Sequence, residues 1–489
     1  MSSRSTTASM SRRDASKLIA GVLALSASPS AFAAQNRTVL EDMAEWLVAL
    51  RYEDLPANVV ERGKRVILDT IGCALGAVDA EPVKVARATV ALEGGSPQAT
   101  IIGVGSKVSA VQAAFLNGMA LRYLDYNDYL GAGRPHHGSV NAAPALAVAE
   151  LQRASGKDLI LGFLAGYEVE VRLRDAVGDN EREGWDWTSI LAQYASAATA
   201  AKILKLDAKK TASALAIAGS NANTLGEVRR GAEMTPAKGT AEPMALKNGV
   251  FAALLAREGL EYPLSVLDGK YGFLAVVPGK VDVALLRNRT GEFGILKSCI
   301  KLWPCVGTAQ APIAAALDIR RQQPNPEEVA QITISLSEFA YRQQSAYPEE
   351  INTREHADHS VPYLVARALL DGQVLVGDFD EKRYRDPRAI ALMKKISLKA
   401  DRSIADDDIG AKIEAVSRAG TRYSATVSIP PGDMRNPPDD ARLSAKFFAL
   451  ADPVLGHARA QTALDAILTV DKAANPNVLI AALAPARRG

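Results

Sequence analysis

Apolar residues recur at helical spacing over most of the chain from residue 38 to about residue 290. After Pro56 they recur at Val60, Val66, Ile67, Ile71 and Leu75, which approximates one buried helix face. Similar patterning predicts helices over residues 109–123, 141–154, 158–177, 186–204, 208–218 and 241–257. Many of these segments combine alanine, which favours helices, with glycine, which lets their backbones pack closely.

The pattern changes near residue 295. Residues 331–336, 395–399 and 412–429 alternate between apolar and polar side chains as half-buried strands do, and Gly420 marks a turn in the last segment. One helix is expected over residues 360–370, and helical spacing resumes at Asp440. This order predicts a mainly α fold in which a large all-helical domain carries an inserted, smaller α+β domain. Such an insertion could close over a substrate as a lid.

These changes divide the chain into four expected segments. They are a leader at 1–33, the first part of the helical domain at 34–294, the α+β lid at 295–436 and the C-terminal part of the helical domain at 437–489. The leader holds four basic residues and one acidic residue, so its charge is +3, while the whole chain carries +2. The remainder therefore carries 2 − 3 = −1, and this lack of a basic excess argues against nucleic-acid binding.

The leader has the order of features found in a signal peptide. Arg12 and Arg13 precede an apolar run at 18–27, and residues 31–33 read Ala-Phe-Ala, a typical cleavage pattern. The run is too short and too weakly apolar for a membrane anchor. We expect export through the twin-arginine route to a bacterial periplasm, with Ala34 as the first mature residue. The alternative is a leader without a targeting role and a cytoplasmic protein.

The chain has three cysteines and no CxxC pair, which disfavours a zinc cluster or a disulfide scaffold. Cys73 lies in an apolar run and is expected to pack in the core. Cys299 and Cys305 flank Lys301 and could pair in an oxidising compartment, but their spacing alone does not decide this.

Residues 121–150 carry the strongest indication of chemistry. Asp125, Asp128 and Tyr129 are spaced to share one face of a helix, and a Gly/Pro loop then delivers His136 and His137 to the next helix. Acidic, phenolic and imidazole groups together suggest proton transfer, and therefore an enzyme. Because adjacent histidines usually point apart and no HExxH-type spacing is present, we expect no metal at these residues. A surface histidine pair without a role is the alternative.

Three other residues are weaker candidates. Lys238 precedes the helix at 241–257, where its charge would join unpaired backbone donors and suit an anionic substrate. Lys301 lies in the rigid apolar segment KLWPC near the expected domain junction, and Tyr341 follows the expected strand QITISLSEFA. Each of the three would be an ordinary surface residue if taken alone.

Four segments together resemble the MmgE/PrpD superfamily. They are LDYNDY with HHGSVNAAPALAVAE, AKGTAEPMALKNGVFAALLAREGL, KLWPC, and TREHADHSVPYLVARALLDG. Their order and spacing match over roughly residues 38–460. The superfamily includes 2-methylcitrate dehydratase, cis-aconitate decarboxylase and iminodisuccinate epimerase. The resemblance implies a large helical domain with an inserted α+β lid, a homodimer, and catalysis without a cofactor.

The resemblance also suggests roles for individual residues. It implies catalytic positions at Asp125 (the first Asp of an LDFDD-type motif), His137 (the histidine of HPS), Lys238 and Tyr341, and a substrate-binding position at Lys301. His136, Tyr129 and Asp186 are further substrate-binding candidates. The chain departs from the family pattern in its acidic motif, where Asn127-Asp128 replaces DD and Tyr129 follows where Thr is common. Asp186 stands where a G-[FW]-H motif of the family has its histidine. Gln310 replaces a family histidine downstream of KxxP.

The expected activity is that of a cofactor-independent hydro-lyase similar to 2-methylcitrate dehydratase. Lysines would hold the carboxylates of a small di- or tricarboxylic acid while an α-proton is removed. Decarboxylation and epimerisation need similar stabilisation of negative charge on carbon, so both stay open as alternatives. A non-catalytic periplasmic acid-binding protein is the opposing class, because Asp186 replaces a family histidine.

Overall fold

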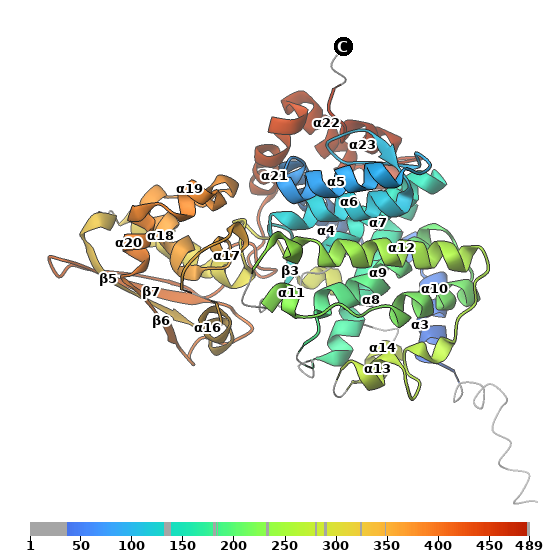
Figure 1. Ribbon diagram of the computed structural model, residues 1–489, viewed down its shortest axis with the longest axis horizontal. Coiled ribbons are helices and arrows are strands. Elements are labelled where there is room, and N and C mark those ends of the chain that lie inside the picture. Colours follow the sequence, from blue (N-terminus) through green and yellow to red (C-terminus); the bar gives the residue numbers. More distant parts are fainter. Residues whose placement is uncertain are drawn as a thin grey trace, which may run out of the picture.

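A computed structural model describes most of the chain. The described residues are 37–131, 138–178, 182, 184–230, 234–278, 281–287, 291–322, 325–347 and 349–486. The leader at 1–33 and the pair His136 and His137 therefore lie outside the described residues. Figure 1 shows a helical part and a smaller part that contains both helices and a sheet, so the prediction of a mainly α fold is confirmed.

The helical part is built from two stretches of the chain. Its long helices from the first stretch are α3 (Val39–Ala49), α4 (Ala57–Ala77), α5 (Glu81–Glu93), α6 (Ala110–Tyr123), α7 (Ala142–Gln152), α8 (Gly156–Val177), α9 (Trp187–Ile203), α10 (Ala208–Ser220) and α12 (Ala241–Arg257). The short helices α11 (Glu227–Arg230), α13 (Phe273–Val276) and α14 (Val283–Arg287) accompany them. The C-terminal stretch adds α21 (Asp440–Leu455), α22 (His457–Leu468) and α23 (Asn477–Ala482).

Local signals set several of these helix starts. Ser109 accepts a hydrogen bond from the backbone N–H of Gln112 and begins α6, and Ser155 does the same with Asp158 at the start of α8. Almost every residue of α9 is buried, which is the pattern of a helix surrounded by others. It packs against α8 and α12, so it lies in the interior of the helical part.

The smaller part contains a four-stranded sheet in the order β6-β5-β7-β8. The strands are β5 (Val329–Leu336), β6 (Ile396–Ala400), β7 (Ala411–Ser417) and β8 (Arg422–Val427). β5 pairs with β6 in parallel and with β7 in antiparallel fashion, and β7 and β8 form a hairpin. A parallel pair needs a long crossover, which explains why several helices separate β5 from β6 where the sequence predicts only one.

The helices of this part are more numerous than the sequence pattern indicates. They are α15 (Gln310–Arg321), α16 (Glu338–Ser345), α17 (Arg354–Ala357), α18 (Val361–Asp371), α19 (Glu381–Tyr384) and α20 (Pro387–Met393). α15 and α18 pack on each other, and α15 also contacts β7 and β8. Their buried residues form an apolar cluster separate from that of the helical part.

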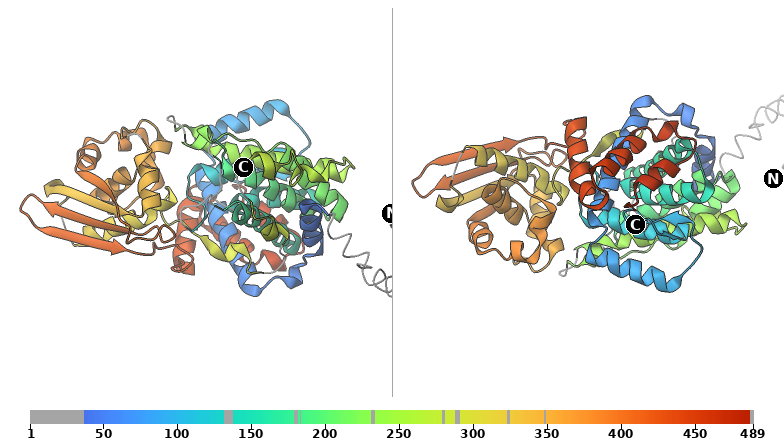
Figure 2. Two further views of the ribbon diagram at one scale, coloured as in Figure 1. Left: turned by 90° about the horizontal axis from the view of Figure 1, so that it is seen from below. Right: turned by 90° about the horizontal axis from the view of Figure 1, so that it is seen from above.

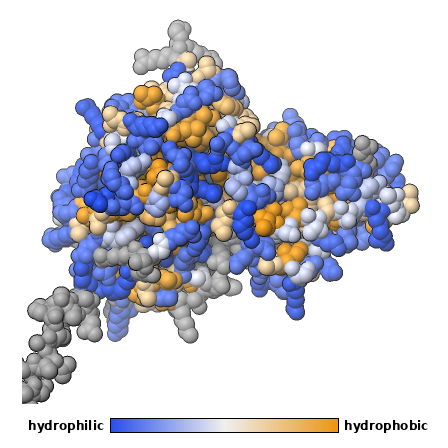
Figure 3. All heavy atoms as spheres, turned by 180° about the vertical axis from the view of Figure 1, so that it is seen from behind, coloured by the Kyte–Doolittle hydropathy of each residue, from blue (hydrophilic) through white to orange (hydrophobic). Residues whose placement is uncertain are grey.

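The two parts lie side by side in all three ribbon views (Figures 1 and 2). In the space-filling view, hydrophilic side chains cover most of the back face of both parts, with smaller apolar patches among them (Figure 3). Among the described residues, no helix has both the length and the apolar character needed to cross a membrane.

Two short antiparallel pairs complete the fold. One joins β1 (Ala99–Thr100) to β2 (Lys107–Val108), and the other joins β3 (Tyr129–Leu130) to β4 (Ser298–Cys299). The second pair brings the segment that follows α6 beside the segment that leads into the smaller part. It thereby brings the stretch that contains Asp125 close to the stretch that contains Lys301, and both residues are predicted site residues.

Candidate active site

The first part of the site is built where α6 ends. The helix stops at Tyr123, and Asp125 adopts a left-handed backbone conformation with φ of 49°. The prediction that Asp125, Asp128 and Tyr129 share a helical face is therefore wrong, because Tyr129 belongs to β3. Left-handed backbone is unfavourable for most side chains, but Asp tolerates it better than most, and the surroundings hold Asp125 in it.

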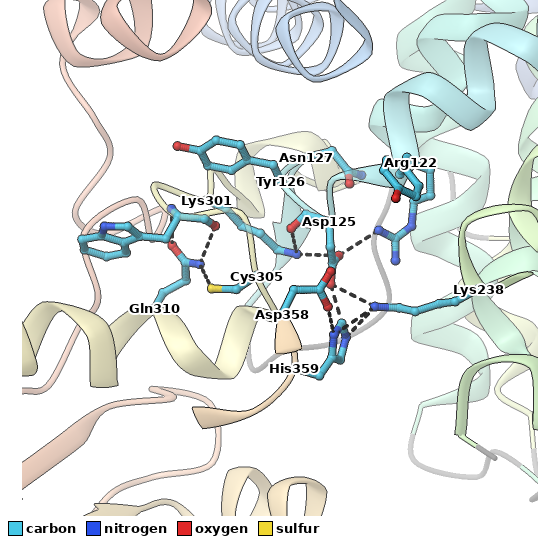
Figure 4. A network of polar contacts seen from close by, with 12 residues as sticks. Arg122, Asp125, Tyr126, Asn127, Lys238, Lys301, Cys305, Gln310, Asp358 and His359 are labelled. Atoms are coloured by element: carbon cyan, nitrogen blue, oxygen red, sulfur yellow. Dashed lines mark hydrogen bonds and ion pairs between the residues drawn. The ribbon is translucent and has the colours of Figure 1, made fainter. Parts of the chain in front are cut away.

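Three cations converge on the Asp125 carboxylate (Figure 4). Its Oδ1 accepts from Arg122 Nη1 at 2.8 Å and from Lys301 Nζ at 2.9 Å, and its Oδ2 accepts from Lys238 Nζ at 3.1 Å. Lys301 Nζ also donates to the backbone oxygen of Asp125 at 2.8 Å. All four residues are buried, so these interactions act in a region of low polarity where charge–charge attraction is strong.

Lys238 joins this group to the smaller part of the molecule. It lies in the short 3₁₀ turn η3 (Pro236–Gly239) before α12, and its Nζ lies 2.5 Å from Nε2 of His359. The other ring nitrogen of His359, Nδ1, contacts the Asp358 carboxylate. A proton on Nδ1 would satisfy Asp358 and leave Nε2 free to accept from the Lys238 ammonium.

Burial moves the proton equilibria of these groups. It lowers the pKa values of Lys238 and Lys301, although the nearby Asp125 charge opposes this in both cases. Burial and the Lys238 charge lower the pKa of His359, against the pull of Asp358. The imidazole is therefore favoured in its neutral form, which can accept or pass on a proton.

Asp186, a predicted substrate-binding residue, lies in an ion-pair network that reaches the Asp125 group. It directly precedes α9 and pairs with Arg229 at 2.9 Å, and Arg229 in turn contacts Glu242 at 3.0 Å. Glu242 also binds Arg122, so a buried chain of alternating charges connects Asp186 to the Asp125 group. Burial alone would raise the pKa of Asp186, but Arg229 and the Ser189 hydroxyl outweigh it and lower the pKa.

Gln310 has a structural position beside Lys301. Its Oε1 accepts from the backbone N–H groups of Leu302 and Trp303, and its Nε2 donates to the backbone oxygen of Trp303 and to the Cys305 sulfur. It therefore holds the KLWPC segment in shape. Cys299 and Cys305, which could have paired, are both free and buried.

Asp128, three residues after Asp125, is a second buried acid. Its Oδ2 accepts from the Tyr167 hydroxyl at 3.0 Å. Burial raises its pKa to about 8, although hydrogen bonds from Ser139 and Tyr167 counteract this. Tyr129, a predicted substrate-binding residue, is fully buried, packs with Cys299, and has its pKa raised by burial.

The remaining predicted residues are not among the contacts of Asp125 described above. Tyr341 lies in α16 and not directly after a strand, because β5 ends at Leu336 and Ser337 caps the following helix. Its partly buried ring packs on the apolar cluster of the smaller part. His136 and His137 lie outside the described residues, so their roles stay predictions.

Asp125, Asp358 and His359 are close enough to share a metal ion. However, Lys238 already lies within hydrogen-bond distance of Asp125 and His359, and Lys301 binds the other oxygen of Asp125. Ammonium groups in these positions would repel a divalent cation and favour an anion. The residues therefore fit a metal poorly and a carboxylate ligand well.

A small cavity opens at this cluster, lined by Arg122, Tyr123, Asp125, Lys238, Gly239, Glu355 and Asp358. Its volume of about 10 Å³ has room for about one water molecule. Arg122 Nη2 is buried and has no hydrogen-bond partner among the described residues, so one strong donor remains available at the cavity. A ligand larger than water would need the surrounding segments to move apart.

Two family models match this chain. The MmgE/PrpD N-terminal domain matches residues 41–286 and the C-terminal domain matches residues 303–472. The chain belongs to the MmgE/PrpD family. The resemblance stated from sequence segments alone is thereby confirmed.

Curated MmgE/PrpD relatives match nearly the whole chain. The cis-aconitate decarboxylase-like protein oryM of Aspergillus oryzae is 27% identical over 91% of this chain and 96% of its own length. A cis-aconitate decarboxylase of Aspergillus terreus is 28% identical over 89% and 93%, respectively. The 2-methylcitrate dehydratase of Salmonella typhimurium is 26% identical over 81% and 87%.

In this MmgE/PrpD chain, sequence reasoning missed His359 as a site residue. The segment TREHADHSVPYL carries the family resemblance, but no spacing within it indicates which histidine faces Lys238. The available signal was Asp358 directly before His359, an acid beside an imidazole just ahead of the Ser360 helix cap. Only the packing of the two parts together places that imidazole beside Lys238 and Asp125.

Proposed function

We propose that this chain is a cofactor-independent lyase that acts on a small tricarboxylic acid. The observation that carries the proposal is the convergence of Arg122, Lys238 and Lys301 on Asp125, with the neutral imidazole of His359 beside them. Buried cations stabilise a substrate carboxylate and the negative charge that develops next to it. The unsatisfied N–H of Arg122 at the cavity adds a third donor for the same purpose.

Decarboxylation is the first reaction to test. Lys238 and Lys301 would hold two carboxylates while the bond from a third carboxylate to its allylic carbon breaks. Carbon dioxide leaves, the electron pair stays on carbon, and a proton from the site's acid adds there. His137 is the acid expected from the sequence, and His359, whose Nε2 lies beside the Lys238 ammonium, is a proton relay among the described residues. The decarboxylase relatives support this choice because they match 86–91% of the chain.

Dehydration of the 2-methylcitrate type is the second candidate. In it a base removes an α-proton, the β carbon–oxygen bond breaks, and the hydroxyl leaves as water after protonation. The observation that favours it is the contact of His359 Nε2 with Lys238 Nζ at 2.5 Å. Burial lowers the pKa of His359, so the imidazole can take up a proton while Lys238 stabilises the carbanion. The dehydratase relatives, matched over 78–81% of the chain, support it further.

One experiment distinguishes these reactions. Purified protein is incubated in D₂O with cis-aconitate, 2-methylcitrate, citrate or iminodisuccinate and followed by proton NMR. Release of carbon dioxide with one fewer carboxylate supports decarboxylation, and formation of a new alkene from 2-methylcitrate supports dehydration. Binding without turnover or deuterium exchange would contradict the proposal and favour a non-catalytic acid-binding protein. Lys238→Met should lower turnover strongly, while Lys247→Met in the following helix serves as the matched control.

We further propose that the smaller part acts as a lid. Arg354 supports this, because it contacts Asp358 at 3.2 Å and stacks on the ring of Tyr123 at the end of α6. Opening at this junction would enlarge the one-water cavity enough to admit a tricarboxylate. Small-angle scattering with and without a bound tricarboxylate tests this, and an unchanged radius of gyration would contradict it.

Two further expectations remain proposals. We propose a homodimer, which light scattering of the purified protein would test. We also propose twin-arginine export, which Arg12→Lys combined with Arg13→Lys should block so that the full-length precursor stays in the cytoplasm. A monomer, or unchanged localisation of the double variant, would contradict these two proposals respectively.

A further inference from the structure

Lys446 of α21 contacts the backbone of both segments that carry the site. Its Nζ donates to the backbone oxygen of Tyr126 at 2.8 Å and to that of Lys301 at 2.9 Å, and it pairs with Asp69 Oδ1 at 2.6 Å. The ammonium group thus donates two hydrogen bonds to backbone carbonyls and is paired with one carboxylate. Only 8% of the residue is exposed, so water competes weakly for these donors.

The contacts of Lys446 with Tyr126 and Lys301 lie just beyond the end of the backbone pairing between β3 and β4. The β3–β4 pair contains only Tyr129–Leu130 and Ser298–Cys299. Extending its antiparallel register would bring the backbone around Tyr126 opposite the backbone around Lys301. The Lys446 ammonium bridges the carbonyls of these two residues, so a side chain continues the cross-link that the ladder began.

The bridge fixes Lys301 at both ends. Its backbone oxygen accepts from Lys446, and its amine donates to the backbone and carboxylate oxygens of Asp125. Asp125 directly precedes Tyr126, the other residue that Lys446 holds. We propose that Lys446 is a positioning residue of the active site, whose ammonium sets the separation of Asp125 and Lys301. This inference rests on the proposed lyase function.

The competing explanation is that Lys446 only neutralises the buried Asp69 of α4. Two variants separate the explanations. Lys446→Met removes both the ion pair and the donors to the two carbonyls, whereas Asp69→Asn removes the ion pair but leaves those donors in place. Arg442→Met is the control, because Arg442 is an exposed cation one turn earlier on the same helix.

Misplacement of catalytic groups by about 1 Å costs up to about 100-fold in rate. We therefore expect Lys446→Met to lower kcat by about 10–100-fold with a smaller change in KM. Asp69→Asn and Arg442→Met should keep most of the wild-type kcat. An equal loss of kcat in Lys446→Met and Asp69→Asn would overturn the inference, and so would a folded Lys446→Met variant with wild-type kcat.

A second measurement applies if Lys446→Met does not fold. Lys446 lines an open cleft of about 470 Å³ between the two parts, together with Tyr126 and Pro304. In Lys446→Ala, ethylammonium could enter from this cleft and replace the missing donors. Recovery of kcat with added ethylammonium supports the inference, and recovery of thermal stability without kcat overturns it.

Failure of the proposed function would be distinguishable from failure of this inference. If the unmodified protein turns over no polycarboxylate, crystal structures of Lys446→Met and Asp69→Asn decide the question. Displacement of Lys301 from Asp125 in the first variant alone supports the positioning role. Unchanged positions in both variants overturn it.

Discussion

Two buried aspartates three residues apart have different surroundings. Asp125 accepts hydrogen bonds from three cationic side chains, those of Arg122, Lys238 and Lys301. Asp128 accepts from the Tyr167 hydroxyl, and burial raises its pKa to about 8. Both side chains are almost completely removed from solvent. Burial alone therefore does not decide whether an acid in this protein is charged, because the neighbouring groups determine the outcome.

The difference assigns the two acids to different tasks. A carboxylate surrounded by cations keeps those cations together and aligned for an anionic ligand. A largely neutral carboxyl can hold a segment through hydrogen bonds without requiring a counter-charge nearby. Four experiments test the difference between these two acids.

The largest effect is expected from Asp125→Asn. The change leaves buried cations without their carboxylate, so we expect loss of turnover and about 3–5 kcal/mol less free energy of unfolding at pH 7. Asp128→Asn replaces a carboxyl whose pKa is raised by burial with a neutral group of similar shape, so it should cost much less than Asp125→Asn at this pH. Urea unfolding of both variants measures this. Equal losses in the two variants would refute the comparison.

The next effect concerns the proton chemistry near Asp125. His137→Ala should lower kcat by about 10²–10⁴-fold while the protein stays folded, because general acid–base catalysis typically contributes this much. His136→Ala is the neighbouring control and should have a smaller effect. A larger loss in His136→Ala would shift the assignment by one residue. If neither variant loses activity while His359→Gln does, the described imidazole carries the chemistry.

Lys238→Ala should both raise KM and lower kcat, since this lysine would bind a carboxylate in the ground state and in the transition state. Steady-state kinetics over a range of substrate concentrations measure the two constants. Lys247→Ala in α12 is the control and should leave both unchanged. A change in KM alone would restrict Lys238 to substrate binding.

Asp128 should also make the stability of the protein depend on pH. Its folded pKa of about 8 lies above the ordinary 3.8, so the folded state binds this proton more tightly than the unfolded state. The associated stability is fully present below about pH 4 and is lost as pH rises toward about 8. The free energy of unfolding of wild type minus that of Asp128→Asn should fall by up to about 1.4 kcal/mol per pH unit in this window. A flat difference from pH 5 to pH 8 would contradict the raised pKa.

The comparison also shows what the sequence could predict. α12 spans residues 241–257 as expected, because apolar spacing is a local property that survives packing. Ser109 and Tyr123 likewise bound α6 closely. The expected helical face through Asp125 is wrong, since its conformation depends on Lys301, which lies 176 residues further along the chain.

Some site residues could likewise be identified from local sequence motifs, whereas others depend on tertiary packing. Motif segments identified Asp125, Lys238 and Lys301, and the structure brings all three together. His359 and Lys446 were missed, because their contacts depend on how the two parts of the molecule and the C-terminal helices pack. Such contacts are tertiary, and no periodicity within either segment encodes them.

The large sequence separation between Asp125 and its hydrogen-bond partners has a consequence for folding. Its partners Lys238 and Lys301 lie 113 and 176 residues away, and the bridge from Lys446 to Lys301 spans another 145. Closing such long loops is entropically costly, and contacts of this kind tend to form late. The cluster should therefore be among the last features to assemble during refolding, after individual helices have formed. Recovery of catalytic activity would then lag behind recovery of helical circular dichroism, so turnover would report completed folding rather than helix content.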